Sequence, residues 1–438
     1  MGRMQFTRRG LLGVTAAGMT GLAAGCEPAG RESAAPPAAA PPALDPASWV
    51  SVQAQFAIER ASAHLATFVF APHPAPVRAA VAAHRDGLDR DATGYLAANE
   101  ERLDTAALAA AAGHLGTRPD QIALTDSTTM GLGLVYTAVR LRPGDEVLTT
   151  EHDFYATHES LRLRAQRDGV TVRRVRLYRD PAATSVDEVV GNLAAAVTPR
   201  TRVVALTWVH SSTGVKLPIR QLAEAVRARS PEALVCVDGV HGFGAEAATP
   251  DQLGCDVLVS GCHKWLLGPR GTGLVWGSDR AWARMPAVIP PFDGRSIGHW
   301  LSGGAGAPAI PGGPAHTPGG YHTFEHRWAL AEAFDLHRRI GPERVAARTR
   351  ELADRLKGGL AGIRGVRLVT PRSADLSAGI VCCAAADLPV GEVVGRLYAA
   401  GVIASSTPYN PSYVRFGATI ANSEADVDAA LAAVRGLM

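Results

Sequence analysis

The chain has 438 residues, 47% of them hydrophobic, which is enough for a substantial core in one two-lobed protein or in two to three domains. Its formal net charge of +3 at pH 7 excludes the strongly basic footprint of a nucleic-acid-binding protein. The cysteines show no CxxC spacing, which argues against a zinc site of that kind, and as a set they do not look like a disulfide framework. Cys236, Cys382 and Cys383 lie in apolar stretches typical of buried thiols.

Residues 1–26 have the pattern of an export signal. The stretch FTRRGLLGVTAAGMTGLAAGC has a basic start, an apolar middle too short for a membrane span, and small residues before Cys26. Residues 7–12 (TRRGLL) resemble a twin-arginine signal, so we expect export by that route to a periplasmic or other extracytoplasmic location. Residues 23–26 (AAGC) loosely resemble a lipoprotein cleavage site, which leaves a lipid anchor at Cys26 open.

An Ala/Pro-rich linker is predicted at 27–47, because such a composition cannot bury a core. We expect the folded part to begin near Trp49. We then expect 48–95 to be the N-terminal segment of a small domain, 96–325 to be a large domain, and 326–438 to be the C-terminal part of the small domain.

From about residue 100, helical and strand patterns alternate. Helices are predicted at 103–116, closing on a glycine, at 128–141 and at 160–169; strands are predicted at 121–127, 144–154, 170–177, 202–210, 233–244, 255–261 and 271–277. Such alternation predicts an α/β fold with a parallel or mixed sheet covered by helices. Ligands of these sheets bind beyond the carboxyl ends of the strands, so the residues after each strand are the candidates for function.

The last third of the chain predicts a smaller α+β lobe. Residues 302–320 are too rich in Gly and Pro for regular structure and read as a functional or disordered loop. Beyond them we expect amphipathic helices at 325–341 and 343–363, short strands at 365–370, 379–385 and 414–418, and a final helix from about Ser423.

Polar groups follow several of the predicted strands. Asp238 and His241 follow one, His210 and Ser211 another, and His263 and Lys264 a third. Lysine is scarce in this chain (Lys216, Lys264 and Lys357), so its position after a strand end is informative. A turn ahead of a predicted helix holds Ser127, Thr128 and Thr129, whose hydroxyl and backbone N–H groups form an anion site at a helix N-terminus.

This set matches the needs of pyridoxal phosphate. Its phosphate needs a helix N-terminus and hydroxyls, which the Ser127–Thr129 turn offers, and its aldehyde needs a lysine for a Schiff base, which Lys264 offers. Its pyridine nitrogen needs a carboxylate, and Asp238 fits that role. Its ring face needs an aromatic or imidazole partner; His152 or Phe154 would serve, and the sequence leaves the choice open.

Other interpretations of single residues are weaker. His322 and His326 have a spacing that metal ligands use, but no further ligand pattern accompanies them, and we expect no metal site. Ser260 and Lys264 do not have the spacing of a serine–lysine hydrolase, and GPRGTG (268–273) opens no helix as a dinucleotide motif would. An exported binding protein, a degenerate homologue and an exported metalloenzyme remain the alternatives from other classes.

Several motifs over residues 50–438 resemble class-V aminotransferase-fold, pyridoxal-phosphate enzymes, in particular the isopenicillin N epimerase-like branch. They are HKWLLGPRGTG (263–273) at the Schiff-base lysine, VDGVHGFG (237–244), TDSTTMGL (125–132), and VRFGATIANSEADVDAAL (414–431). The resemblance implies fold type I, with a large domain built on a mostly parallel seven-stranded sheet and a smaller α+β domain. It also implies a homodimer.

The resemblance assigns roles residue by residue. Lys264 would form the Schiff base and move the proton at the substrate α-carbon, and Asp238 would pair with the pyridinium. His241 and Ser211 would lie near the ring's O3′, and Thr128 with its neighbours and His263 would hold the phosphate. Arg415 would bind the substrate α-carboxylate, a bidentate contact that suits a guanidinium.

Three departures from the family pattern qualify these assignments. Trp208 replaces the usual histidine ahead of the Ser-x-x-Thr-Gly pattern, and Gly261 stands where sister families carry a phosphate-binding serine. The compact Gly-Thr of a late loop, which reaches the neighbouring subunit's phosphate, is stretched here into GGYHTFE (319–325), so Thr323 is the candidate for that contact.

The segment before Arg415, GVIASSTPYNPSY (401–413), contains no cysteine, whereas cysteine desulfurases of this fold carry their nucleophilic cysteine there. We therefore expect an aminotransferase or epimerase acting at the α-carbon of a small amino-acid-like substrate. The alternative is a C–S lyase that eliminates from a cysteine conjugate. Loops such as 287–320 determine which side chain the substrate carries, and the sequence alone does not show which one they select.

Overall fold

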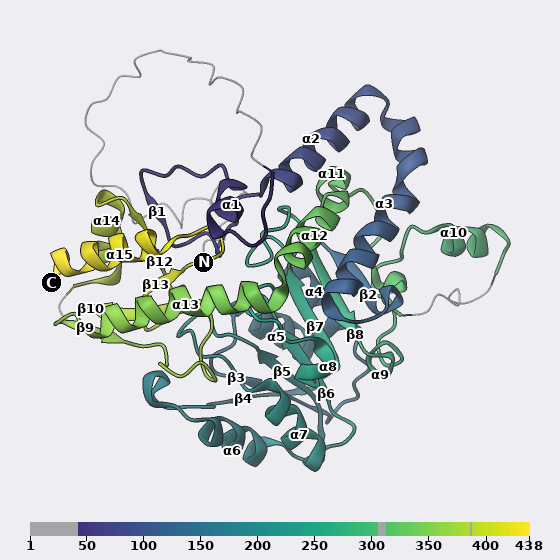
Figure 1. Cartoon of the computed structure of the whole chain (residues 1–438). Helices are drawn as coiled ribbons and strands as arrows, with labels where there is room; N and C mark the ends of the chain where they lie inside the picture. The colour runs from purple at the N-terminus through teal and green to yellow at the C-terminus, as the bar shows by residue number, and fades with distance from the viewer. Residues whose placement is uncertain (1–42, 305–311, 386–387) are drawn as a thin grey trace, which may run out of the picture. The chain divides into compact units, whose positions relative to one another are not determined.

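The structure, a computed structural model, describes residues 43–304, 312–385 and 388–438 (Figure 1). The predicted export signal, Cys26 and nearly all of the predicted linker lie outside these residues. The first helix, α1 (Trp49–Ala54), begins at the residue where the sequence predicts the folded part to begin. No helix within the described ranges combines the length and apolar character needed to cross a membrane.

The large lobe is built on a seven-stranded sheet with the order β2-β8-β7-β6-β5-β3-β4. β8 runs antiparallel to both β2 and β7, and the other neighbouring strands are parallel, which confirms the predicted mostly parallel sheet. The strands are β2 (Ile122–Thr125), β3 (Glu146–Thr150), β4 (Thr171–Val175), β5 (Thr201–Thr207), β6 (Leu234–Asp238), β7 (Val257–Gly261) and β8 (Gly273–Gly277).

Helices cover both faces of this sheet because its central strands are apolar on both sides. Along β5, Val204 and Leu206 join one core cluster and Val203 and Ala205 join the other. The first cluster is completed by α3 (Ala92–Leu115), α6 (Val186–Ala196), α7 (Ile219–Arg229) and α12 (Leu330–Ile340). The second is completed by α4 (Thr128–Ala138), α5 (Tyr155–Asp168) and α9 (Asp279–Trp282).

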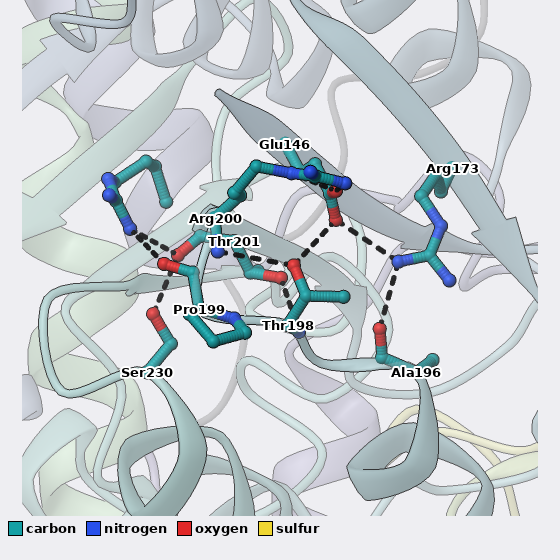
Figure 2. Close-up of polar contacts among 9 residues, drawn as sticks. Glu146, Arg173, Ala196, Thr198, Pro199, Arg200, Thr201 and Ser230 are labelled. Carbon is teal, nitrogen blue, oxygen red and sulfur yellow. Dashed lines mark hydrogen bonds and ion pairs between the residues drawn. The ribbon is translucent and has the colours of Figure 1, made fainter. Parts of the chain in front are cut away.

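A buried carboxylate ties together the amino-terminal edge of the sheet. Figure 2 shows Glu146, at the start of β3, between Arg200, Thr198 and Arg173. Its oxygens accept hydrogen bonds from Arg200 Nε at 2.8 Å, Thr198 Oγ1 at 2.8 Å and Arg173 Nη1 at 3.1 Å. The hydrogen bond from Arg200 lowers the pKa of Glu146. This network fixes the ends of β3, β4 and β5 on the edge opposite to the one where ligands bind.

The smaller lobe contains an antiparallel sheet with the order β12-β13-β10-β9. Its strands are β9 (Val366–Leu368), β10 (Ile380–Ala385), β12 (Ser405–Ser406) and β13 (Val414–Gly417), and it packs against α13 (Pro342–Ala361), α14 (Val390–Ala399) and α15 (Glu424–Leu437). Ser423 caps α15, as the sequence predicts. β1 (Ala63–His64) pairs with β11 (Val402–Ile403), which joins the amino-terminal segment to this lobe.

Several bounds differ from the sequence-based expectations: β3 ends at Thr150 rather than at 154, β6 ends at Asp238 rather than at 244, and α5 begins at Tyr155 rather than at 160. Helix α3 begins at Ala92, well before the predicted residue 103, because Asp91 caps it, and it runs across the predicted domain limit at 95/96. Within 302–320, a short 3-10 turn, η3 (Gly313–His316), forms where no regular structure is expected. The domain limits themselves stay a prediction. The other elements are α2 (Ala75–Arg90), η1 (Pro119–Gln121), η2 (Pro181–Ala183), α8 (Pro250–Leu253), α10 (Gly294–Leu301) and α11 (Phe324–Trp328).

Candidate active site

The predicted residues converge at the carboxyl ends of four neighbouring strands. Lys264 follows β7, Asp238 ends β6, Ser211 follows β5 and His152 follows β3. These strands are adjacent in the sheet in that order. The α/β topology therefore brings together side chains that are up to 112 positions apart in the sequence, taking His152 and Lys264 as the extremes.

The turn before α4 lies against the lysine segment. Ser127 caps the helix by accepting a hydrogen bond from the Met130 N–H at 3.1 Å. The Thr128 hydroxyl accepts a hydrogen bond from the Gly261 N–H at 2.7 Å. The backbone N–H groups of Thr128 and Thr129 are in the first turn of α4, where they have no intrahelical acceptor and are available to an anion.

The structure explains why Gly261 replaces the serine of sister families. A Cβ atom at Gly261 would lie 2.9 Å from His263 Cε1 and 3.1 Å from Thr128 Oγ1, so these two side chains occupy the space of a serine. Ser260 does not substitute for it, because its buried hydroxyl donates to the Gly261 carbonyl at 3.0 Å. His263 Nδ1 is buried and has no hydrogen-bond partner among the described residues, as expected if its partner is a bound ligand.

Asp238 and Lys264 form the charged centre of the site. Asp238 is buried, and one of its oxygens accepts a hydrogen bond from the Val240 N–H at 3.0 Å. Burial raises the pKa of Asp238, and the Val240 N–H and the charge of Lys264 oppose this effect. Burial lowers the pKa of Lys264; Asp238 opposes the shift and the positive charge of Arg415 adds to it. A lysine in such surroundings gives up its proton more readily than an exposed lysine does, and a Schiff base requires the free amine.

His241 connects Lys264 to the core. Its Nε2 atom lies 3.5 Å from Lys264 Nζ, and its Nδ1 atom accepts a hydrogen bond from the Trp265 indole N–H at 3.1 Å. The turn that carries His241 continues to Gly244, whose φ is +83°. A Cβ atom there would lie 2.5 Å from the Leu266 backbone nitrogen, so this turn packs directly against the segment that follows Lys264.

His152 stacks on Tyr178, with ring centroids 3.9 Å apart and an interplanar angle of 5°. The Tyr178 hydroxyl shares hydrogen bonds with His210 Nδ1 and Thr213 Oγ1, both at 2.9 Å, which fixes the tyrosine ring behind the histidine. Burial lowers the pKa of His152 to about 3, so its ring is a neutral imidazole. One face of His152 is covered by Tyr178, and the other is the face that a ligand ring could contact.

Phe154 belongs to a different part of the site. It packs edge-on against Tyr409 with a centroid distance of 6.1 Å. The Tyr409 hydroxyl shares a hydrogen bond with Ser211 Oγ at 2.8 Å. Tyr409 lies on the cysteine-free segment before Arg415, and burial raises its pKa well above the usual range. This segment therefore contributes a neutral phenol to the site.

Arg415 enters the site from β13 of the smaller lobe. Its Nε donates to Ser405 Oγ at 3.2 Å and its Nη1 donates to the Ser211 carbonyl at 3.3 Å. The guanidinium also lies over the ring of Phe68, 5.2 Å from the centroid. No carboxylate among the described residues forms an ion pair with Arg415, so this buried cation is available to an anionic group of a ligand.

Thr323 lies apart from this cluster, at the start of α11. Together with Thr125, Asp126 and His322 it lines a small cavity on the outer side of the turn before α4. His322 contacts Asp126 at 3.5 Å, whereas His326 bonds to the Arg270 carbonyl at 2.8 Å. No group of three or more His, Cys, Asp or Glu residues in the described ranges has the geometry to hold a metal ion.

The other two lysines are held by neighbours. Lys216 pairs with Glu246 at 3.1 Å. Lys357 is buried and bonds to Ser377 Oγ at 2.7 Å and to Asp354 at 2.8 Å. Lys264 is therefore the lysine whose amine faces the site without an ion pair. The five cysteines within the described residues are all buried and free (Cys236, Cys255, Cys262, Cys382 and Cys383).

These residues fit pyridoxal phosphate. The unpartnered His263 nitrogen and the first turn of α4 suit a phosphate, and the buried Asp238 carboxylate suits a protonated pyridine nitrogen. The exposed face of His152 suits an aromatic ring, and Lys264 supplies the amine. Sequence reasoning missed Phe68, Tyr178, Trp265 and Tyr409, which contact the predicted residues; an aromatic residue next to Lys264 was the one signal available for them.

Comparisons with known proteins agree with this geometry. The sequence profile of the class-V aminotransferases matches residues 79–429. An isopenicillin N epimerase from Amycolatopsis lactamdurans is 30% identical, over 75% of this chain and 83% of the epimerase. The isopenicillin N epimerase from Streptomyces clavuligerus is 29% identical, over 76% of this chain and 84% of that enzyme. A solved complex of the cystine C–S lyase C-DES with its product cysteine persulfide has a TM-score of 0.76 at 22% identity, covering 85% of this chain and 96% of that one, and so shares the fold.

Proposed function

Since the chain belongs to the class-V aminotransferase family and is a pyridoxal-phosphate-dependent enzyme, we propose that it acts at the α-carbon of an amino-acid-like substrate through a Schiff base on Lys264. One observation carries this proposal: of two adjacent strands, β6 ends in a buried carboxylate, Asp238, and β7 is followed three residues later by Lys264, the lysine that lacks an ion pair. The proposed reaction type is transamination or epimerisation, as in the epimerases that the chain resembles.

Each residue contributes one physical effect. Thr128, Thr129 and His263 would hold the phosphate, and Asp238 would keep the pyridine nitrogen protonated. The bound cofactor supplies an electron sink that acidifies the substrate α-carbon. We assign ring stacking to His152, because Tyr178 supports it from behind, whereas Phe154 packs edge-on against Tyr409.

Substrate orientation falls to Arg415. Its guanidinium is buried at the edge of the site and has no carboxylate partner among the described residues, so an α-carboxylate would satisfy it. With the carboxylate held there, the amine of Lys264 is the base that is positioned to take the proton from the α-carbon and to return it. Burial lowers the pKa of Lys264 to about 8, which brings the amine closer to the pH range in which a general base works well.

A C–S lyase is the alternative reaction. The described cysteines are buried, and burial raises the pKa of each of them, so none resembles the reactive thiolate of a desulfurase. The segment before Arg415 offers Tyr409 instead. Elimination from a cysteine conjugate needs the cofactor and a base at the α-carbon and no cysteine nucleophile, so the same residues would support it.

The cofactor step is tested by absorbance. Purified protein supplied with pyridoxal phosphate should turn yellow, lose the colour on borohydride reduction, and carry the reduced adduct on Lys264. Lys264→Ala should abolish the adduct, whereas Lys216→Ala, the matched control, should retain it because Lys216 is paired with Glu246. A colourless wild-type protein would overturn the proposal.

The reaction type is then tested with D- and L-amino acids and cysteine conjugates. Keto acid, inverted stereochemistry or pyruvate with released thiol would identify transamination, epimerisation or C–S lysis respectively. Spectral change without any of these products from any tested compound would contradict action at the α-carbon.

We also propose that the enzyme is an exported homodimer. The pattern of residues 1–26 supports twin-arginine export, with an anchor at Cys26 if that residue is lipidated. The resemblance, which assigns Thr323 to the phosphate site of a neighbouring subunit, supports the homodimer; in the structure Thr323 lines a cavity with Asp126 and does not contact Lys264. Cell fractionation of a variant with Arg8 and Arg9 changed to lysine, and light scattering of the purified protein, test these two points. Unchanged export or a monomer would contradict them.

A further inference from the structure

The residue after the site lysine, Trp265, makes a directional contact. Its indole N–H donates to His241 Nδ1 at 3.1 Å. An indole nitrogen has a hydrogen and no acceptor lone pair, so His241 Nδ1 must be the acceptor in this bond. A neutral imidazole that accepts at Nδ1 carries its proton on Nε2, and the tautomer of His241 is therefore set by Trp265.

The Nε2 atom of His241 lies 3.5 Å from Lys264 Nζ. In this tautomer Nε2 is a donor, and it needs an acceptor on the lysine side. A free amine has a lone pair and can accept, whereas an ammonium group has only donors. The contact therefore favours the free-amine form of Lys264, as burial and the positive charge of Arg415 do, whereas the negative charge of Asp238 favours the ammonium form.

Among the residues that the structure describes, the charges that act on His241 oppose its protonation. The charged groups that act on it are Lys264 and Arg415, both positive, and Phe68 presents its ring at a centroid distance of 5.9 Å. A second proton on His241, at Nδ1, would face these cations and would also break the bond from Trp265. His241 thus stays a neutral imidazole that donates in one direction.

Trp265 is itself held firmly. It is 2% exposed and stacks on Phe68, with centroids 5.3 Å apart and an interplanar angle of 25°. On another side, Gly379 leaves room for the indole: a Cβ atom there would lie 2.3 Å from Trp265 Cη2. The direction of the indole N–H is therefore fixed by packing and does not depend on a mobile side chain.

We propose that Trp265 is a positioning residue for Lys264: it fixes His241 as the Nε2–H tautomer, and His241 presents that hydrogen to the lysine nitrogen, which keeps Lys264 ready to react as a free amine. The inference rests on the proposed Schiff base at Lys264. In that condensation Nζ forms the new bond to the aldehyde carbon, and its two protons leave with the aldehyde oxygen as water. Only the free amine has the lone pair for this step.

The test is the rate at which cofactor-free protein attaches pyridoxal phosphate, followed by absorbance across a range of pH. In Trp265→Phe the ring remains but the N–H is lost, so His241 can move its proton to Nδ1 and accept a hydrogen bond from a Lys264 ammonium group. Stabilising the ammonium form should raise the midpoint of the pH profile by about one unit. Well below the midpoint, the variant should therefore attach the cofactor about tenfold more slowly than wild type does. Trp276→Phe is the matched control. It also loses an indole N–H, which donates to Thr117 Oγ1 and not to His241, and it should leave the midpoint unchanged.

A second measurement does not require any variant at position 265 to fold. Nitrogen-15 NMR of histidine-labelled, cofactor-free wild-type protein, with signals assigned through His241→Asn, should show the neutral Nε2–H tautomer at neutral pH. An Nδ1–H tautomer or a cation, or an unmoved midpoint in Trp265→Phe, would overturn the inference. If wild-type protein attached no cofactor at all, the proposed function would fail instead, and the NMR result would still decide the tautomer.

Discussion

The support behind His152 is open to a quantitative test through Tyr178. Tyr178→Phe removes the hydroxyl and keeps the ring that stacks on His152. Thr213 retains a contact from the Val215 N–H at 3.4 Å, but His210 Nδ1 loses its hydrogen-bond partner inside a fully buried site. One buried polar atom left unpaired lowers the free energy of unfolding by about 1–3 kcal/mol, and we expect a loss in that range.

Tyr178→Leu removes the ring as well as the hydroxyl. The stacked pair contributes about 0.5–1.5 kcal/mol beyond simple burial, and His152 would then be free to tilt, so we expect pyridoxal phosphate to bind several-fold more weakly. In Tyr178→Phe the cofactor affinity should stay close to that of the wild type.

Urea denaturation of the cofactor-free proteins measures the first effect, and equilibrium titration with pyridoxal phosphate measures the second. The reasoning would be refuted if Tyr178→Phe weakened the cofactor as much as Tyr178→Leu did, since the stacked ring would then not be the support. A Tyr178→Phe protein as stable as the wild type would show that the hydroxyl does not satisfy His210.

Three further predictions concern other parts of the chain. Glu146→Gln should be less stable than wild type at pH 7. Because the folded-state pKa of Glu146 is lowered, the carboxylate stabilises the fold above its unfolded pKa of about 4.3, and this stabilisation is lost as the pH falls through the folded-state pKa. The difference in urea midpoint between the two proteins should therefore shrink in acid, and a difference that does not change with pH would contradict this. Gly244→Ala should lower the free energy of unfolding by about 2–5 kcal/mol, because a positive φ and a clash with Leu266 combine; a melting temperature equal to that of wild type would show that the turn can adjust. Arg415→Lys should raise KM about tenfold for the substrate found in the amino-acid scan and leave the cofactor absorbance intact, because lysine cannot make the same forked contacts; a change confined to kcat would count against carboxylate binding.

The sequence predicts the strands of the large lobe well, because their apolar runs are buried on both faces and end in polar residues. Asp238, Lys264 and Ser211 could be predicted for that reason: each occupies a position that the topology of a parallel sheet makes functional. The turn before α4 could be predicted because Ser127 caps the helix, and a cap is a local feature.

The supporting aromatic residues could not be found in the same way. Arg415 lies over the ring of Phe68 and Tyr409 bonds to Ser211, across sequence separations of 347 (415 − 68) and 198 residues. Neither contact leaves a periodic pattern or a motif in the sequence. The stacking of Tyr178 on His152, on which we base the proposal that His152 rather than Phe154 contacts the cofactor ring, is likewise a property of packing.

The scarcity of lysine has a practical consequence for chemistry on this protein. Lys216 is paired with Glu246, and Lys357 is enclosed by Ser377, Asp354 and two backbone carbonyls, so both amines are already engaged by neighbouring groups. An aldehyde probe with a mild reductant should therefore attach at Lys264 ahead of any other side chain, without mutagenesis to clear the background. Lys264 is thus the lysine side chain to use for attaching a spectroscopic reporter inside the site, where the reporter would respond to Asp238 and His241.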